Sequence, residues 1–401
     1  MGAIVITVRR IHTVTNRQIT DSIFYAGVND KTLDLFESQY VVPNGVTYNS
    51  YVILDDKCAI MDTADKRAST EWKQNITEIL GGRKPDYLVV LHLEPDHSAN
   101  IQNICEHYPD MKLILSAKAK AMLPQFFDED LTDRCIAVSE GDELSLGRHT
   151  LKFIMAPMVH WPEVMVAYEA SEKVLFSADA FGKFGTLDTQ EDWTCEARRY
   201  YFNIVGKYGA QVQTLLKKAK TLEFETICPL HGPVLTEDLE YYIGKYDLWS
   251  RYEPEDDGVF IACASIHGNT MNACRKLSEI LTEKGAKKVV VTDLARDDMA
   301  EAVEDAFRYD KIVFAAASYD AGVFPCMEEF LHHLKAKNFQ NRKAAIVENG
   351  SWAPSAGKVM RTMLEGMKNI SICDNAVTMK TTMKENTVNE MEQLAEELLA
   401  K

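Results

Sequence analysis

The chain has 401 residues, which is long for one compact domain and suits two, because single hydrophobic cores stop growing at roughly 250–300 residues. Its 60 acidic residues outnumber its 44 basic ones and give a net charge of −16, which argues against a nucleic-acid-binding protein. No apolar run approaches the roughly 20 residues that span a bilayer, so we expect no membrane association. The nine cysteines are never spaced C-x-x-C, which indicates a reducing compartment, most simply the cytoplasm, and no Cys-ligated metal.

The first 250 residues mix hairpin-like strands with helices. Residues 51–54 and 58–61 read as two strands around a tight turn, and 70–80 reads as a helix that stops at a Gly-Gly pair. Residues 87–91 form a short continuous apolar run, which is typical of a buried strand. A long helix is expected over 195–220. This mixture of strands and helices predicts a first α/β domain over residues 1–252.

A dense polar cluster, His92-Leu93-Glu94-Pro95-Asp96-His97, directly follows the apolar run at 87–91. Residues 92 and 94 alternate onto one face of an extended segment, and Pro95 turns the chain so that Asp96 and His97 approach the same point. A solvated polar turn is the ordinary alternative. Four potential ligands within six residues favour a metal site instead.

Three more candidate ligands follow singly, each just past a predicted strand: His160, Asp179 and His231. Any one of them alone would be an ordinary polar residue. Because functional sites gather at strand ends, the three together complete a seven-residue candidate set with the cluster at 92–97.

The pattern of predicted elements changes after an acidic Pro/Gly-containing stretch at 253–258, which we expect to be a linker. Beyond it, short apolar strands alternate with amphipathic helices. The expected strands are 259–264, 288–293, 311–316, 343–348 and 370–376. Five such units predict a doubly wound parallel sheet over 253–401, of the size of a flavodoxin-like domain.

A candidate phosphate loop follows the first strand of this second domain. It comprises Ser265, Ile266, His267, Gly268, Asn269 and Thr270 and runs into a helix. Free N–H groups at the helix start and the two hydroxyls form an anion site, and glycine lets the backbone turn tightly. By itself the segment is equally an ordinary strand–helix turn. In this position it resembles the flavodoxin signature, which implies FMN, and the dinucleotide fingerprint G-x-G-x-x-G is absent.

Flavin rings lie at the carboxyl ends of neighbouring strands, which directs attention to two further loops. The candidate ring contacts are Ser318, Tyr319, Asp320 and Gly322 in one loop and Asn349, Gly350, Ser351 and Trp352 in the other. Trp352 offers a flat apolar ring for stacking, against the alternative that it covers the sheet edge.

The first domain's ligand pattern, H-x-[EH]-x-D-H and then His, Asp and His, resembles the metallo-β-lactamase fold (an αββα domain) over most of residues 1–250. Hydrolases of that fold have a second His where this chain has Glu94, and a hard oxygen ligand shifts the preference from zinc towards iron. Followed by a flavodoxin-like domain, the whole chain resembles the flavodiiron proteins of the A type, although their flavin loops more often read Ser-Pro-Thr than Tyr319-Asp320.

This resemblance implies two irons per chain and assigns the ligands. One iron would take His92, Glu94 and His160, and the other Asp96, His97 and His231, with Asp179 bridging. The same seven residues would be the catalytic ones. Tyr25 and Tyr201 are candidate donors to a bound diatomic, against the reading that both are buried core tyrosines.

The resemblance also implies an oxidoreductase that reduces O2 to water, NO to N2O, or both, with electrons delivered through FMN. Two alternatives remain: a zinc hydrolase with an accessory flavodoxin-like domain, and a flavodoxin-type carrier with a docking module. No rubredoxin-like C-x-x-C pair is present, so electrons are expected from a separate protein such as rubredoxin or from a reduced soluble cofactor. A head-to-tail homodimer, or a dimer of such dimers, is expected to bring the FMN of one chain to the irons of the other.

Overall fold

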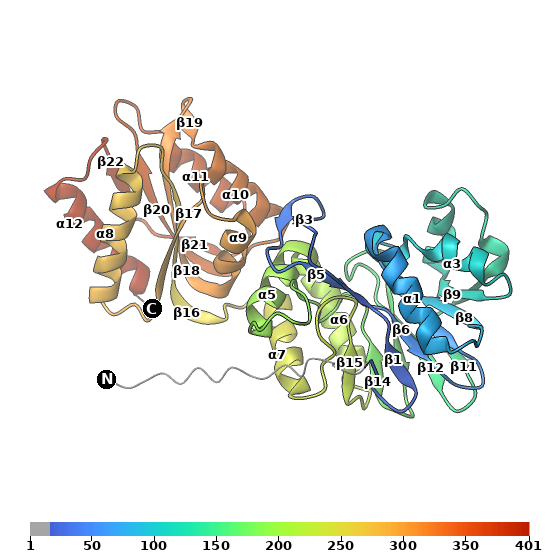
Figure 1. The fold of residues 1–401 in the computed structure, drawn as a ribbon. Coiled ribbons are helices and arrows are strands. Elements are labelled where there is room, and N and C mark those ends of the chain that lie inside the picture. Colours follow the sequence, from blue (N-terminus) through green and yellow to red (C-terminus); the bar gives the residue numbers. More distant parts are fainter. Residues whose placement is uncertain (1–16, 401) are drawn as a thin grey trace. The chain divides into compact units, whose positions relative to one another are not determined.

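The computed structural model describes residues 17–400, and the chain divides into two compact units (Figure 1). The first unit extends to Tyr201 and includes Ala210–Asp247, whereas the second contains Phe202–Gly209 and the chain from Leu248 onward. The short segment 202–209 therefore packs with the second unit although it lies well before the predicted boundary at 252. Within the described range, no helix is long and apolar enough to cross a membrane.

The first unit contains two large sheets. The six-stranded sheet has the order β1 (Ile23–Tyr25), β6 (Tyr51–Ile53), β7 (Ala59–Met61), β8 (Tyr87–Val90), β9 (Lys112–Ser116) and β10 (Cys135–Val138). The five-stranded sheet has the order β11 (Glu143–Ser145), β12 (Thr150–Met155), β13 (Met165–Glu169), β14 (Val174–Phe176) and β15 (Thr226–Cys228). Two small hairpin-like pairs complete it: β2 (Val28–Asp30) with β5 (Val46–Tyr48), and β3 (Leu35–Phe36) with β4 (Tyr40–Val41).

Helices accompany both sheets of the first unit. They are α1 (Ser69–Leu80), α2 (Pro95–Ser98), α3 (Ile101–His107), α4 (Ala117–Met122), α5 (Trp193–Tyr200), α6 (Gly209–Ala219) and α7 (Leu239–Ser250). Figure 1 shows α1 and α3 beside the six-stranded sheet and α6 and α7 beside the five-stranded one. This is the layered α/β arrangement expected of a metallo-β-lactamase-like domain.

One helix prediction in this half is wrong. The single helix expected over 195–220 is interrupted between α5 and α6 by a π turn, Tyr201–Val205, and a 3₁₀ turn, Gly206–Tyr208. A Cβ atom at Gly209 would lie 2.3 Å from the Ser250 carbonyl oxygen, so the backbone approaches a neighbour there too closely for a side chain. The helical hydrophobic pattern continues through the interruption, which is why periodicity alone does not reveal it.

The second unit is a doubly wound parallel sheet, as predicted. Its strands are β17 (Val289–Asp293), β16 (Asp256–Ala264), β18 (Tyr309–Tyr319), β20 (Arg342–Asn349) and β21 (Ile370–Ile372) in that order, with β22 (Val377–Met379) on β20 and β19 (Gly322–Val323) on β18. Its helices are α8 (Asn269–Glu283), α9 (Met299–Arg308), α10 (Pro325–Ala336), α11 (Ala356–Glu365) and α12 (Glu385–Leu399). The order places the end of β16 between those of β17 and β18, where ligands of such sheets bind.

Two local expectations in this half need correction. The fifth strand, expected over 370–376, is two short strands, β21 and β22, that pair with different parts of β20. The expected linker at 253–258 is also not free, because its last residues begin β16. The Glu255 N–H donates to the Arg308 carbonyl at 2.8 Å, which holds the preceding residues against the second unit.

Candidate metal and flavin sites

The cluster at 92–97 takes its shape from the end of β8. His92 lies two residues past that strand, and Pro95 is the first residue of α2, a position that suits its fixed φ and missing N–H. Glu94 precedes this helix, and Asp96 and His97 lie within it. The turn at Pro95 therefore brings residues on both of its sides towards one point.

The remaining three candidate ligands come from the five-stranded sheet. His160 lies in the connection between β12 and β13. Asp179 and His231 each lie three residues past neighbouring parallel strands, and the register pairs Phe176 at the end of β14 with Cys228 at the end of β15. Equal spacing from paired strand ends places Asp179 and His231 side by side.

The first group of ligand atoms contains two imidazoles and two carboxylates. Glu94 Oε2 lies 3.0 Å from His160 Nε2 and 3.3 Å from His92 Nε2. Asp179 Oδ2 lies 3.1 Å from His160 Nε2 and 3.6 Å from His92 Nε2. Ligand atoms that are each about 2.0–2.2 Å from a shared ion lie at such mutual distances.

The second group lies next to the first. His97 Nε2 and His231 Nε2 are 3.1 Å apart, and Asp96 Oδ2 is 3.3 Å from the former and 3.2 Å from the latter. Asp179 Oδ1 lies 3.2 Å from His97 Nε2. The two oxygens of Asp179 thus face different groups, which is the arrangement of a carboxylate that bridges two ions.

The electrostatics of this cluster also suit cations. All of its members are buried except Glu94, whose side chain is 14% exposed. Burial would lower the pKa of His160, but hydrogen bonds with Asp179 and Glu94 outweigh it and raise the pKa to about 9. Although burial would raise the pKa of Asp179, the adjacent histidines hold it well below its ordinary value. An ionised carboxylate in a buried site needs positive charge beside it, so the residues fit two metal ions.

Hydrogen bonds to Nδ1 fix the ring orientations of two candidate ligands, His92 and His231. Glu163 Oε1 lies 2.8 Å from His92 Nδ1 and also accepts from the Leu93 N–H at 3.0 Å. His231 Nδ1 lies 2.6 Å from the Thr47 carbonyl oxygen. A carboxylate or carbonyl behind the imidazole is the usual support of a metal-ligating histidine, since it fixes the tautomer that leaves Nε2 free.

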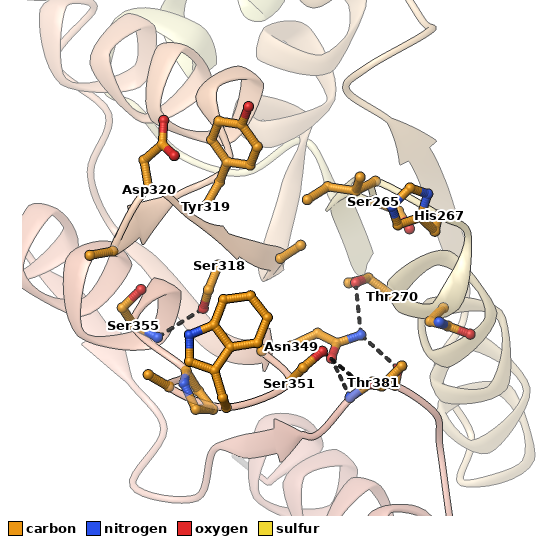
Figure 2. A pocket seen from close by; sticks show the side chains of 18 residues that line it. Ser265, His267, Thr270, Ser318, Tyr319, Asp320, Asn349, Ser351, Ser355 and Thr381 are labelled. Atoms are coloured by element: carbon orange, nitrogen blue, oxygen red, sulfur yellow. Dashed lines mark hydrogen bonds between the residues drawn. The ribbon is translucent and has the colours of Figure 1, made fainter.

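The second unit carries a pocket of about 650 Å³ at the carboxyl ends of β16, β18 and β20, a size that suits a cofactor. Figure 2 shows Ser265, His267 and Thr270 on one side of it and Tyr319 and Asp320 on another. Twelve of the fourteen predicted flavin contacts line it: Ser265, Ile266, His267, Asn269, Thr270, Ser318, Tyr319, Asp320, Asn349, Gly350, Ser351 and Trp352. Gly268 and Gly322 do not. Gly268 adopts φ +87° before α8 and shapes the loop, and Gly322 lies on β19.

The loop before α8 presents donors that suit a phosphate. The first-turn N–H groups of a helix have no intrahelical partners, and α8 begins at Asn269 within this loop. The Gly268 N–H donates to Ser265 Oγ at 3.1 Å, which tightens the turn. No lysine or arginine is among the residues that line the pocket. Trp352, which is 91% exposed, offers a free apolar ring to a flat ligand, so the pocket fits FMN.

Comparison with known proteins matches both halves of the chain. The ODP family beta lactamase profile covers residues 46–232. The rubredoxin oxygen:oxidoreductase structure from Desulfovibrio gigas has a TM-score of 0.89 at 25% identity, over 95% of this chain and 97% of that one. The flavodiiron protein from Giardia intestinalis has a TM-score of 0.88 at 22% identity over 96% of both chains. A nitric oxide reductase of Moorella thermoacetica is 27% identical over 360 residues, 87% of this chain and 90% of the relative.

These comparisons support the interpretation of this chain as a flavodiiron protein. Its first unit carries the seven candidate iron ligands, and its second unit carries the flavin pocket. The fold-class expectation and the family resemblance drawn from the sequence are both confirmed.

The tyrosines near the candidate iron site have different surroundings, and Tyr25 follows the core reading. The Tyr25 hydroxyl donates to Asn49 Oδ1 at 2.8 Å and is a core residue. Tyr200, the neighbour of the candidate Tyr201, has its ring 5.5 Å from that of His231. Its buried hydroxyl has no hydrogen-bond partner among the described residues. Burial and then the charges of Asp179 and Glu94 raise the pKa of Tyr200 well above its ordinary value, so it stays a proton-bearing donor.

Sequence reasoning also missed a residue of the flavin site. Thr381 lines the pocket, and its backbone N–H donates to Asn349 Oδ1 at 3.0 Å. Asn349 Nδ2 in turn donates to Thr270 Oγ1 at 3.3 Å, so these three residues connect the phosphate loop with the ring side (Figure 2). Thr381 lies beyond β22, and a flavodoxin-like strand order is the only signal that would have directed attention to it.

Proposed function

We propose that this flavodiiron protein reduces O2 to water, NO to N2O, or both, at a non-haem iron pair that receives electrons through FMN. One observation carries the proposal: the two oxygens of Asp179 face two separate ligand groups, one of which includes Glu94, in a chain that also has a flavin pocket. The printed names of a relative and a structural neighbour, a nitric oxide reductase and a rubredoxin oxygen:oxidoreductase, support the choice of substrates.

Each ligand group would hold one iron. His92, Glu94 and His160 would bind the first, Asp96, His97 and His231 the second, and Asp179 both. When bound, the iron pair and the flavin supply the electrons: four, with four protons, for O2 to two waters, or two, with two protons, for two NO to N2O and water.

The protein's own groups prepare the site for this chemistry. Glu163 and the Thr47 carbonyl hold the rings of His92 and His231 with their Nε2 atoms turned inward. Tyr200 places a buried hydroxyl beside the ligand cluster, where it can donate a hydrogen bond to a bound diatomic. Burial excludes bulk water, and Glu94 is the most exposed of the seven ligand residues.

In the second unit, Ser265, Asn269 and Thr270 would hold the FMN phosphate through neutral donors. Tyr319 and Trp352, which lie on different loops of the pocket, would contact the ring system. The Ser318 hydroxyl accepts from the Ser355 N–H at 2.8 Å and fixes one loop against the other.

Partners and location are part of the same proposal. A separate donor, rubredoxin or a reduced soluble cofactor, would supply electrons, and the protein would act in the cytoplasm, where its nine free cysteines stay reduced. A head-to-tail homodimer, or a dimer of such dimers, would bring the FMN of one chain to the irons of the other.

The test combines metal analysis with gas consumption. Protein from iron-replete expression should hold close to two irons per chain and, once reduced, should consume O2, NO or both. Asp179→Ala should lose the pair of irons, whereas Asp188→Ala, an exposed carboxylate paired with Lys31 in the same unit, should not. Zinc without iron in an active protein would favour the hydrolase alternative and would contradict the proposal.

A further inference from the structure

A small apolar cavity lies in the first unit between the five-stranded sheet and α6. Ile154, Val166 and Leu175 form its sheet side, and Leu215 and Leu216 form its helix side. The cavity measures about 20 Å³, and roughly 10–15 Å³ holds one water-sized molecule. It therefore has room for one very small guest.

The lining does not suit water. Ser177 is the one polar side chain among the lining residues, and its hydroxyl donates to the Ala180 carbonyl at 2.7 Å. A buried water needs two to four polar partners, and cavities that lack them stay dry and accept apolar guests. The guest that this space suits is therefore apolar.

Two of the residues that line the cavity directly follow a candidate metal ligand in the chain. Ala180 and Phe181 line it, and they directly follow Asp179, the carboxylate that faces both ligand groups. The side chain of Asp179 is 1% exposed. A guest beside Ala180 is thus one residue along the chain from the bridging carboxylate.

A groove on the surface shares part of the cavity's lining. Ile154 and Leu222 line both the cavity and a surface groove of about 380 Å³. Leu222 and Ala219 are only partly buried, unlike the leucines deeper in α6. In the groove, Lys218 Nζ pairs with Glu140 at 2.7 Å and donates to the Met155 carbonyl at 2.9 Å. Only the side chains of Ile154 and Leu222 thus need to move for the groove to open into the cavity.

We propose that this cavity binds the gaseous substrate and that the groove and cavity form its path to the iron pair. The inference rests on the proposed function, because it takes O2 or NO as the substrate. Both are small diatomics of low polarity, which favour an apolar space over water. Glu94 lines neither the cavity nor the groove.

The first experiment locates the guest with xenon. Crystals of the iron-loaded protein under xenon pressure should show the atom between α6 and the five-stranded sheet. Leu216→Ala enlarges the cavity and should raise xenon occupancy severalfold, and Ala219→Leu fills it from the partly exposed end and should abolish binding. Absence of xenon from both the wild-type and the Leu216→Ala cavity would overturn the proposal.

The second experiment tests whether the gas reaches the iron pair through this cavity, with KM for the gas as the readout. In Ala219→Leu, KM for the gas should rise severalfold, while kcat at saturating gas and KM for the electron donor stay unchanged. The matched control is Ala210→Leu, the same substitution at an exposed position of α6. An unchanged gas KM in Ala219→Leu would show that the substrate arrives elsewhere, such as past Glu94. Should the wild type consume neither gas, the proposed function would fail, whereas the xenon result would still decide what the cavity binds.

Discussion

Tyr200 is the residue near the candidate iron ligands whose role is least expected from the sequence. Its hydroxyl is buried and has no hydrogen-bond partner among the described residues, and burial together with the nearby carboxylates raises its pKa well above the ordinary value. A buried donor without a partner is costly, so a bound substrate is the natural acceptor.

We predict that Tyr200→Phe lowers kcat roughly tenfold or more, since a hydrogen bond to a charged group contributes about 1.5–3 kcal/mol and a decade of rate corresponds to about 1.4 kcal/mol. Iron content should stay unchanged, because phenylalanine fills the same space. Steady-state gas consumption measures kcat, and metal analysis measures the iron content. Tyr201→Phe makes the same substitution at the next residue and serves as the comparison for Tyr200→Phe. A normal kcat in Tyr200→Phe would assign its hydroxyl to packing alone.

As a candidate iron ligand, His160 would make iron binding depend on pH. Its pKa of about 9 in the metal-free site means that the ring carries a proton at pH 7–8, and a metal ligand must be neutral. Iron(II) binding should therefore release protons, and the apparent affinity should rise with pH until about pH 9. Anaerobic calorimetry in two buffers of different ionisation enthalpy counts the protons. Binding without proton release at pH 7.5 would contradict the raised pKa.

At the scale of elements, the turn from β16 into α8 is the candidate site for the flavin phosphate. Thr270 is buried in the first turn of α8, and its Oγ1 accepts from Asn349 Nδ2. The hydroxyl therefore belongs to a fixed hydrogen-bonded set rather than to a mobile surface.

Thr270→Val keeps the shape and removes the hydroxyl, so FMN affinity should fall about tenfold or more for the loss of a bond worth roughly 1.5–3 kcal/mol. Fluorescence titration of the flavin-free protein measures this. Thr282→Val, at an exposed position of the same helix, should bind FMN normally. Equal affinity in the two variants would place the phosphate elsewhere.

The sequence was informative wherever candidate ligand or phosphate-binding residues directly follow a predicted strand. The cluster at 92–97, the three later ligand candidates and the loop at 265–270 all follow strands that their apolar pattern reveals. The groups that orient the candidate ligand histidines could not be predicted in the same way. Thr47 acts through its backbone carbonyl, and Glu163 is a single carboxylate whose role exists only once β8 lies beside the β12–β13 connection. Tertiary packing also decided the interruption between α5 and α6.

At the scale of the whole molecule, the iron ligands and the flavin pocket lie in different units, so electrons must pass between units. A head-to-tail dimer would let them pass between chains. We predict that Asp179→Ala and the double variant Ser265→Ala/Thr270→Val are each inactive alone, whereas co-expressed heterodimers recover activity at one of two mixed sites.

Oxygen or NO consumption by tagged, purified heterodimers measures this recovery. Each parent variant must keep its remaining cofactor, which metal and flavin analysis checks. Heterodimers that stay inactive under those conditions would show that electrons pass within one chain.

The joining of two sheets at the metal site also has a consequence for biosynthesis. Residues 92–97 belong to the strand end of the first sheet and leave the ribosome early, whereas Asp179 and His231 come much later, from paired strands of the second sheet. A nascent chain therefore has no complete site until β15 has docked beside β14. We therefore expect tight iron loading to follow translation of the whole candidate metal-binding unit, so that the iron content of a preparation from iron-replete expression should report the fraction of chains in which both sheets have assembled.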